Sequence, residues 1–318
     1  MELRGALAGL RRDDLEWRRG QLAMAKALSA WRREPAAAPV LAAMKRFGAG
    51  AVLASCGPLA ELFMQGAARA PEFADSLVVA ALAALDGNPL GQLPLPHGAS
   101  DAVPTLVLAR DGDATLAIVA YDGAVLAMLP PPGTARFRPV ESWNCVLRGS
   151  GAADVVRWRD GCLPEIQHMA LGEGQVHYRR GDATAVEVRR ADGALVVLRL
   201  ERALRDAEPV REVRLADGAL LHRASARRAD SRDELIVSLL GRMERMDAIP
   251  RLAALALGEG GEALRWRALC EVIALDAVVG VEILRRVAAG AQDPLAVQAG
   301  ELREALFASR PELREAAA

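Results

Sequence analysis

The chain has 318 residues, of which 52% are hydrophobic and 25% are charged, and its formal net charge at pH 7 is −1. This length and composition indicate a globular protein with two or three domains and enough apolar residues for buried cores. The near-zero charge argues against nucleic acid or an anionic membrane as a partner, and an aromatic content of 4% is too low for a base-stacking or carbohydrate-binding surface.

The basic residues are almost all arginines, because Lys26 and Lys45 are the only lysines. Together with the abundance of alanine and glycine, this indicates a bacterial protein encoded by a GC-rich genome. The first twenty residues alternate in charge and contain no apolar stretch typical of a signal peptide. The longest uncharged apolar stretch, 49–60, is interrupted by Gly57-Pro58 and is too short to span a bilayer. We therefore expect a cytoplasmic protein whose dispersed cysteines are reduced.

Residues 1–90 are predicted to form a helical segment. Apolar residues recur there at helical spacing, and proline and glycine residues interrupt the pattern. The last helix begins near Pro71 and ends at Asp86-Gly87; it is apolar on all sides, so we expect it to be buried. Residues 91–103 are rich in proline and glycine and are predicted to form a linker.

Residues 104–228 are predicted to form an antiparallel β domain. Short apolar, β-branched runs alternate with turn signals, which is typical of a sandwich, jelly roll or barrel. Asp-Gly is a strong hairpin signal, because a type I′ turn requires positive φ at both central residues. Five such pairs occur in the domain, beginning at Asp111, Asp122, Asp160, Asp192 and Asp217.

Residues 229–318 are predicted to form a helical tail. Ser231 and Glu234 have the spacing of a capping box at the start of its first helix. The pattern of 263–273 partly recurs at 296–306, and this arrangement resembles HEAT-type repeats, which implies stacked helical hairpins. The expected fold class is therefore α+β, a central antiparallel sandwich or jelly roll with a helical segment on either side of it in the sequence.

The β domain resembles the cupin jelly roll in its number of strands and its glycine-marked turns. Where cupins carry a histidine pair and a glutamate, this chain has Glu141-Ser-Trp-Asn-Cys145, without histidine. The resemblance therefore implies the cupin architecture without the usual cupin metal ligands.

Four histidines limit the possible metal sites, and His-x-His does not occur. The best cluster is Glu165, His168 and His177, because Glu165-x-x-His168 would place both side chains on one face of a helix. These are the candidate ligands of a metal-dependent enzyme; the alternative is that the histidines are solvated or hydrogen-bonded loop residues. No nucleophile motif or phosphate loop is recognisable, so no catalytic residue and no cofactor is predicted.

Seven arginines fall on predicted strands and could form an anion-binding surface if several share a sheet face: Arg157, Arg159, Arg179, Arg180, Arg189, Arg190 and Arg199. Arg157 and Arg159 flank Trp158, so strand alternation places both guanidinium groups on the same side. Such a pair can bind a carboxylate or a phosphate, which makes these two residues candidates for an anion site. A solvated sheet face balanced by neighbouring acids is the alternative interpretation.

In the tail, Arg265, Trp266 and Arg267 are the candidate residues for binding a partner protein, because Trp and Arg dominate interface energetics. Packing of Trp266 into the β domain is the alternative. From the repeat-like tail and the lack of a catalytic set, we expect a non-enzymatic accessory or scaffold protein that binds another protein. A cupin-like metal-dependent enzyme and a small-molecule-binding protein are the other hypotheses.

Overall fold

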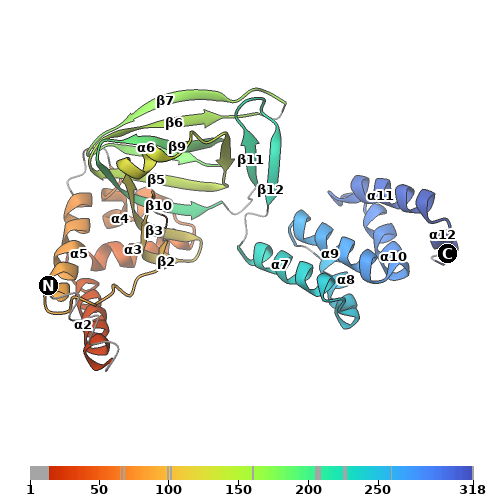
Figure 1. Ribbon diagram of the computed structural model, residues 1–318, viewed down its shortest axis with the longest axis horizontal. Helices are drawn as coiled ribbons and strands as arrows, with labels where there is room; N and C mark the ends of the chain where they lie inside the picture. Colours follow the sequence, from red (N-terminus) through yellow and green to blue (C-terminus); the bar gives the residue numbers. More distant parts are fainter. Residues whose placement is uncertain are drawn as a thin grey trace. The chain divides into compact units, whose positions relative to one another are not determined.

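The computed structural model describes residues 14–64, 66, 69–98, 100, 102–159, 161–204, 209–224, 228–258 and 260–316. The chain forms two compact units, Met1–Ala207 with Val213–Ala219 and Glu208–Glu212 with Leu220–Ala318. The fold class is α+β, as predicted: helices precede and follow a central region of antiparallel strands (Figure 1). None of the described helices is long and apolar enough to cross a membrane.

The N-terminal part of the first unit is helical. It consists of α2 (Leu15–Trp31), α3 (Ala38–Gly48), the 3-10 helix η1 (Leu53–Ser55), α4 (Gly57–Glu61) and α5 (Arg69–Asp86). The prediction that the last of these helices is buried on all sides is wrong. Phe73 and Leu77 are buried, whereas Val79 is 67% exposed. A helix rich in alanine and valine on every side carries no polar stripe that would mark its solvent face.

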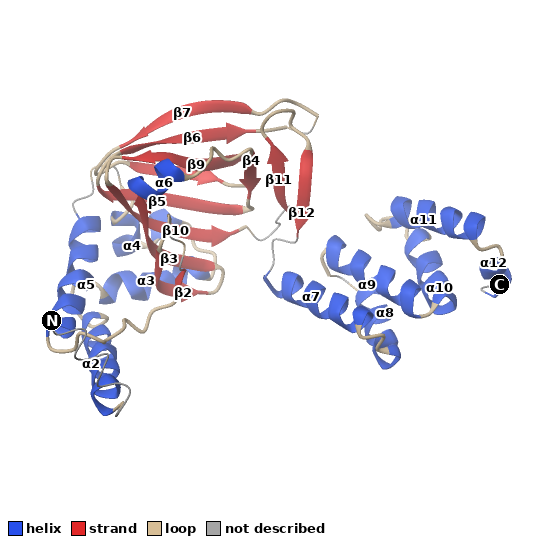
Figure 2. Ribbon diagram, in the orientation of Figure 1, coloured by secondary structure: helices blue, strands red, loops and turns tan. Residues whose placement is uncertain are grey.

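Two antiparallel sheets follow in the first unit (Figure 2). The six-stranded sheet has the order β1-β2-β3-β10-β5-β8, and the three-stranded sheet has the order β7-β6-β9. The chain passes directly from β5 to β6 and from β9 to β10, so it changes sheet at tight corners, as in a jelly roll. The strands of the larger sheet are β1 (His97–Gly98), β2 (Thr105–Asp111), β3 (Ala114–Asp122), β5 (Val140–Arg148), β8 (Val176–Arg180) and β10 (Ala194–Ala203); those of the smaller sheet are β6 (Gly151–Arg157), β7 (Glu165–Leu171) and β9 (Thr184–Ala191).

The remaining elements of the β region are short. They are α6 (Gly123–Met128), β4 (Thr134–Phe137), β11 (Val210–Arg214) and β12 (Leu220–Ala224); the last three form a sheet with the order β12-β11-β4. Phe137 from β4 packs with Val156 and Trp158 in a small cluster on the outer side of the β7-β6-β9 sheet, hereafter the three-stranded sheet. This cluster leaves the inner side of that sheet free to face the larger sheet.

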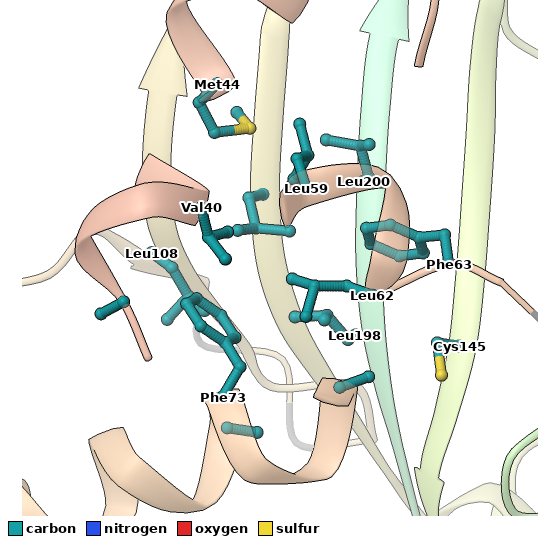
Figure 3. Close-up of a cluster of buried hydrophobic side chains, with 14 of the residues drawn as sticks. Val40, Met44, Leu59, Leu62, Phe63, Phe73, Leu108, Cys145, Leu198 and Leu200 are labelled. Atoms are coloured by element: carbon teal, nitrogen blue, oxygen red, sulfur yellow. The ribbon is translucent and has the colours of Figure 1, made fainter. Parts of the chain in front are cut away.

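One face of the six-stranded sheet packs on the N-terminal helices, and the other faces the three-stranded sheet. Successive side chains of a strand point to opposite faces, so Leu198 lies on the helix side and Val197 on the sheet side. Burial raises the pKa of the Cys145 thiol on the helix side, which keeps it protonated as a core residue. Figure 3 shows the helix-side core, with Val40, Met44, Leu59, Leu62, Phe63 and Phe73 meeting Leu108, Cys145, Leu198 and Leu200.

The C-terminal end of α3 lies against the β2–β3 hairpin. A Cβ atom on Gly48 would be 2.1 Å from the carbonyl oxygen of Asp111, so only glycine fits this contact. Arg202 of β10 binds the same end of α3: its Nη1 donates to the carbonyl oxygens of Phe47 (3.0 Å) and Ala51 (2.6 Å). Its guanidinium also forms an ion pair with Glu141. These contacts fix the helical part on the sheet.

The Asp-Gly pairs do not all close hairpins. Those beginning at Asp111 and Asp217 connect β2 to β3 and β11 to β12, as predicted. The pair beginning at Asp192 instead connects β9 to β10, which lie in different sheets. The hairpin predicted at Asp122 is wrong, because its carboxylate accepts hydrogen bonds from the first backbone N–H groups of α6 and caps that helix. Asp160 lies outside the described residues.

The tail of the second unit is an array of helices in which α9 contacts α7, α8 and α10. Their shared core includes Val237, Leu252, Leu269 and Leu284. Ser231 lies within α7 rather than at its N-cap, so the predicted capping box is wrong. The helices are α7 (Arg228–Arg242), η2 (Met246–Ala248), α8 (Ile249–Leu257), α9 (Glu262–Leu275), α10 (Ala277–Ala288), α11 (Ala296–Ser309) and α12 (Glu312–Ala316).

Candidate functional site

A cavity of about 590 Å³ lies between the two sheets of the sandwich. Its floor consists of side chains from β3, β5, β8 and β10 of the six-stranded sheet, and its roof of side chains from β6, β7 and β9. Valines such as Val186 and Val188 supply much of the roof. A concave, partly apolar space with a few polar groups is the usual form of a small-molecule site.

The polar groups of the floor form a row across three strands. Arg199 on β10 pairs with Asn144 on β5, and Asn144 pairs with His177 on β8. Glu201 on β10, Ser142 on β5 and Arg179 on β8 form the next row, displaced by two residues along the same strands. Residues directly opposite each other in antiparallel strands share a face, so all these side chains point toward the cavity.

The guanidinium group of Arg199 is held by two neutral partners. Its Nε donates to Oδ1 of Asn144 (2.9 Å), and its Nη2 donates to the hydroxyl oxygen of Tyr121 (2.7 Å). The amide of Asn144 is itself oriented, because its Nδ2 donates to the Ser142 hydroxyl (2.9 Å). Within the described part of the chain, Nη1 of Arg199 has no hydrogen-bond partner, and it is not occluded. The arginine is therefore fixed with one amino group open to the cavity.

The floor carries more positive than negative charge. Neither Arg199 nor Arg179 forms an ion pair with a carboxylate among the described residues, and Arg179 donates only to the carbonyl oxygen of Thr184 (3.3 Å). Burial, followed by repulsion from Arg199, lowers the pKa of Arg179. Burial also opposes the charge on Arg199, but Tyr121 and Glu201 outweigh it and raise the pKa of Arg199. Both groups remain cationic at neutral pH.

The carboxylates near these arginines compensate them only partly. Glu201 acts on both arginines electrostatically, and its Oε1 lies 3.6 Å from Arg138, a third cation. Glu187 interacts electrostatically with both arginines as well, and burial raises its pKa. His177 adds no charge at pH 7, since burial lowers its pKa. On the floor itself, the two cations Arg199 and Arg179 are thus accompanied by one carboxylate, Glu201, so an anionic ligand would complete the charge balance.

The three predicted metal ligands do not form a site. Glu165 and His168 lie on strand β7 rather than on a helix, so a separation of three residues places them on opposite faces. His168 is 85% exposed and its Nδ1 lies 2.7 Å from Oδ1 of Asp154, whereas His177 belongs to the other sheet. Among the described residues, no group of three or more His, Cys, Asp or Glu side chains could hold a metal ion.

The two predicted anion-binding arginines are separated. Strand β6 ends at Arg157, which lines the cavity from the roof and donates from Nη1 to Oε1 of Gln167 (3.2 Å). Arg159 follows the strand, is exposed, and does not line the cavity. The prediction that both arginines share one face depended on strand alternation, which ends with β6 at Arg157 and therefore does not apply to Arg159.

The predicted partner-binding residues have structural contacts in the tail. Arg265 is buried rather than exposed: its Nε donates to the carbonyl oxygen of Ala256 (3.1 Å), and its Nη1 and Nη2 bind Asp293. Trp266 packs against the core of the tail itself. Arg267 remains at the surface, where its Nε lies 3.0 Å from Oε1 of Glu271 on the next turn. The three residues therefore do not form one exposed patch.

From the sequence, Arg199 and Arg179 were recognised only as arginines on predicted strands, and neither was selected as a site residue. Arg199 carried a usable signal, because it is a single charge within the apolar strand Leu195–Leu200 and an inward charge on a strand requires partners. Asn144 and Tyr121 carried no such signal, since neither side chain is charged at neutral pH and either can face solvent from a strand.

No protein-family model and no curated protein matches the chain. Solved structures similar to part of it include a 7S globulin from Momordica charantia, with TM-score 0.27, 14% identity, and coverage of 38% of this chain and 35% of that one. A variant of oxalate decarboxylase from Bacillus subtilis has TM-score 0.26 and 20% identity, over 40% of this chain and 34% of that one. A cupin-superfamily protein from Desulfitobacterium hafniense has TM-score 0.23 and 14% identity, over 34% of this chain and 83% of that one.

The similar structures thus include cupin-superfamily proteins. The chain spans about a third of the length of the globulin and of the decarboxylase. All three TM-scores are below 0.5.

Proposed function

We propose that the sandwich is a cupin-like ligand-binding domain whose cavity binds a small molecule with a carboxylate group. The observation that carries this proposal is Arg199, a guanidinium held by Asn144 and Tyr121 with its Nη1 open to the cavity and with no carboxylate partner among the described residues. A bound carboxylate would supply the missing charge through charge-assisted hydrogen bonds. Because Arg199 is already oriented, little side-chain entropy is lost on binding.

The test compares carboxylates with their uncharged amides, such as butyrate with butyramide and benzoate with benzamide, by isothermal titration calorimetry on the full chain. We expect the acids to bind and the amides not to bind. Arg199→Gln keeps a planar polar side chain but removes the charge, and it should weaken acid binding about tenfold or more. Arg159→Gln is the matched control and should bind like the wild type, since Arg159 does not line the cavity. Equal affinity of the wild type and Arg199→Gln, or no binding of any acid, would refute the proposal.

A second candidate function is protein binding by the tail, in the accessory or scaffold role expected from the sequence. The candidate binding surface is on α7, because Trp266 packs against the core of the tail. Leu235 is 74% exposed, and Ile236 and Leu239 are exposed on the same side of α7, away from the buried Val237; the exposed Met243 directly follows the helix. An apolar stripe at this spacing is the form in which a helix presents anchors to another protein. We place both functions in the bacterial cytoplasm, in keeping with the free cysteines.

Pull-down from a native lysate tests the tail. The double substitution Leu235→Asp and Leu239→Asp should remove a partner that the wild type retains, because it places charges in the centre of the apolar stripe. Val297→Asp changes an equally exposed apolar residue on α11 and should leave the partner bound. The same set of bound proteins for all three chains would show that the α7 stripe is not the binding surface.

A further inference from the structure

Resting on the proposed carboxylate site, we infer that the ligand is a dicarboxylate held between the two sheets, with one carboxylate on Arg199 in the floor and the other near Arg157 in the roof.

The cations of the cavity come from both sheets. Arg199 and Arg179 belong to β10 and β8 of the six-stranded sheet, and Arg157 belongs to β6 of the three-stranded sheet. A single carboxylate can bind one guanidinium with full geometry, so it would leave the opposite wall uncompensated. A ligand with an anionic group at each end would satisfy both walls.

Arg157 is available for such a contact. Its partner is the neutral side chain of Gln167, which orients the guanidinium at the edge of the cavity. Glu165 is its direct neighbour on β7, but the two residues form no ion pair in the described structure. The other arginine at this edge, Arg180, is paired with Asp182 and is therefore compensated within the protein. Arg157 is thus a cation of the roof that forms no ion pair with a carboxylate among the described residues.

The size of the site fits a short dicarboxylate. Facing sheets of a sandwich lie about 10 Å apart, so a ligand only a few carbon atoms long can present an anionic group to each wall. The cavity of about 590 Å³ is within the usual range for small-molecule pockets. Its valine-lined roof would contact the methylene groups between the two carboxylates.

The experiment uses succinate, glutarate and adipate, each compared with its own monoamide, in calorimetric titrations of the full chain. Acid and monoamide have the same length and differ by one charge. We expect the wild type to bind the preferred diacid about tenfold more tightly than its monoamide. Arg157→Gln should remove this preference without weakening the monoamide, Arg199→Gln should weaken both, and Arg159→Gln should match the wild type.

Two results would overturn the inference and separate it from the proposed function. If each diacid and its monoamide bind equally well, or if Arg157→Gln weakens both to the same extent, the second carboxylate contact does not exist, although carboxylate binding stands. If neither the diacids nor the monoamides bind, both the dicarboxylate inference and the proposed function fail.

Discussion

Gly48→Ala is expected to destabilise the first unit by about 3 kcal/mol, the upper end of the usual cost of overpacking, since the clash is with backbone atoms. The new Cβ would lie 2.1 Å from the carbonyl oxygen of Asp111 and 2.7 Å from its carbonyl carbon. Helix propensity acts in the opposite direction, because alanine is favoured over glycine within a helix by about 1 kcal/mol. The sign of the change therefore reports whether α3 is docked on the β2–β3 hairpin.

Urea denaturation followed by circular dichroism measures this change in the free energy of unfolding. The matched control is Gly300→Ala in α11, where a Cβ would meet no atom within 4 Å, so only propensity acts and stability should rise slightly. A Gly48→Ala protein as stable as the wild type would mean that the helix end and the hairpin are not in contact in solution.

Arg265→Met is expected to destabilise the helical tail by about 3 kcal/mol. The Asp293 carboxylate would lose its partner while only 18% exposed, and the carbonyl oxygen of Ala256 would lose a hydrogen bond. The hydrogen bonds from Arg265 are also the main reason that the pKa of Asp293 is lowered. We therefore expect hydrogen exchange of the α9 and α11 backbone to become faster in the variant at neutral pH.

Two further variants separate the ion pair from simple loss of a side chain. Arg267→Met removes an exposed pair with Glu271 on the same helix and should change stability by less than about 0.5 kcal/mol. Adding Asp293→Leu to Arg265→Met removes the unpaired charge and should restore part of the stability. Equal effects of Arg265→Met and Arg267→Met would show that Arg265 is not a buried structural residue.

Local patterns predicted the parts of the fold that depend on local physics. The change from helical to strand periodicity and back defined the α+β class, and the Asp-Gly pairs at Asp111 and Asp217 were correctly assigned to hairpins. The pair at Asp122 failed because the same side chain that favours a turn also caps a helix. The prediction that α5 is buried on all sides failed because the sequence of this helix does not distinguish a buried face from an exposed one.

The candidate site was predicted less well, for a related reason. Glu165 and His168 were grouped by a helical spacing, but their segment is a strand. Arg265 was chosen for its residue type, and nothing in the sequence indicated that it pairs with Asp293, 28 residues away. Residue type and spacing indicate which chemistry a side chain can perform, but they do not indicate its partners.

The sequence by itself determined the fold class and placed Arg157 on the strand face opposite Val156, because these depend on backbone geometry and on periods of two and 3.6 residues. Only the tertiary structure decided that Arg199 meets Asn144 and Tyr121, which are 55 and 78 residues away. Strand order and register bring such residues together, and they result from packing over the whole sandwich. The charge balance of a cavity depends on these distant neighbours, so the site became visible only in the folded chain.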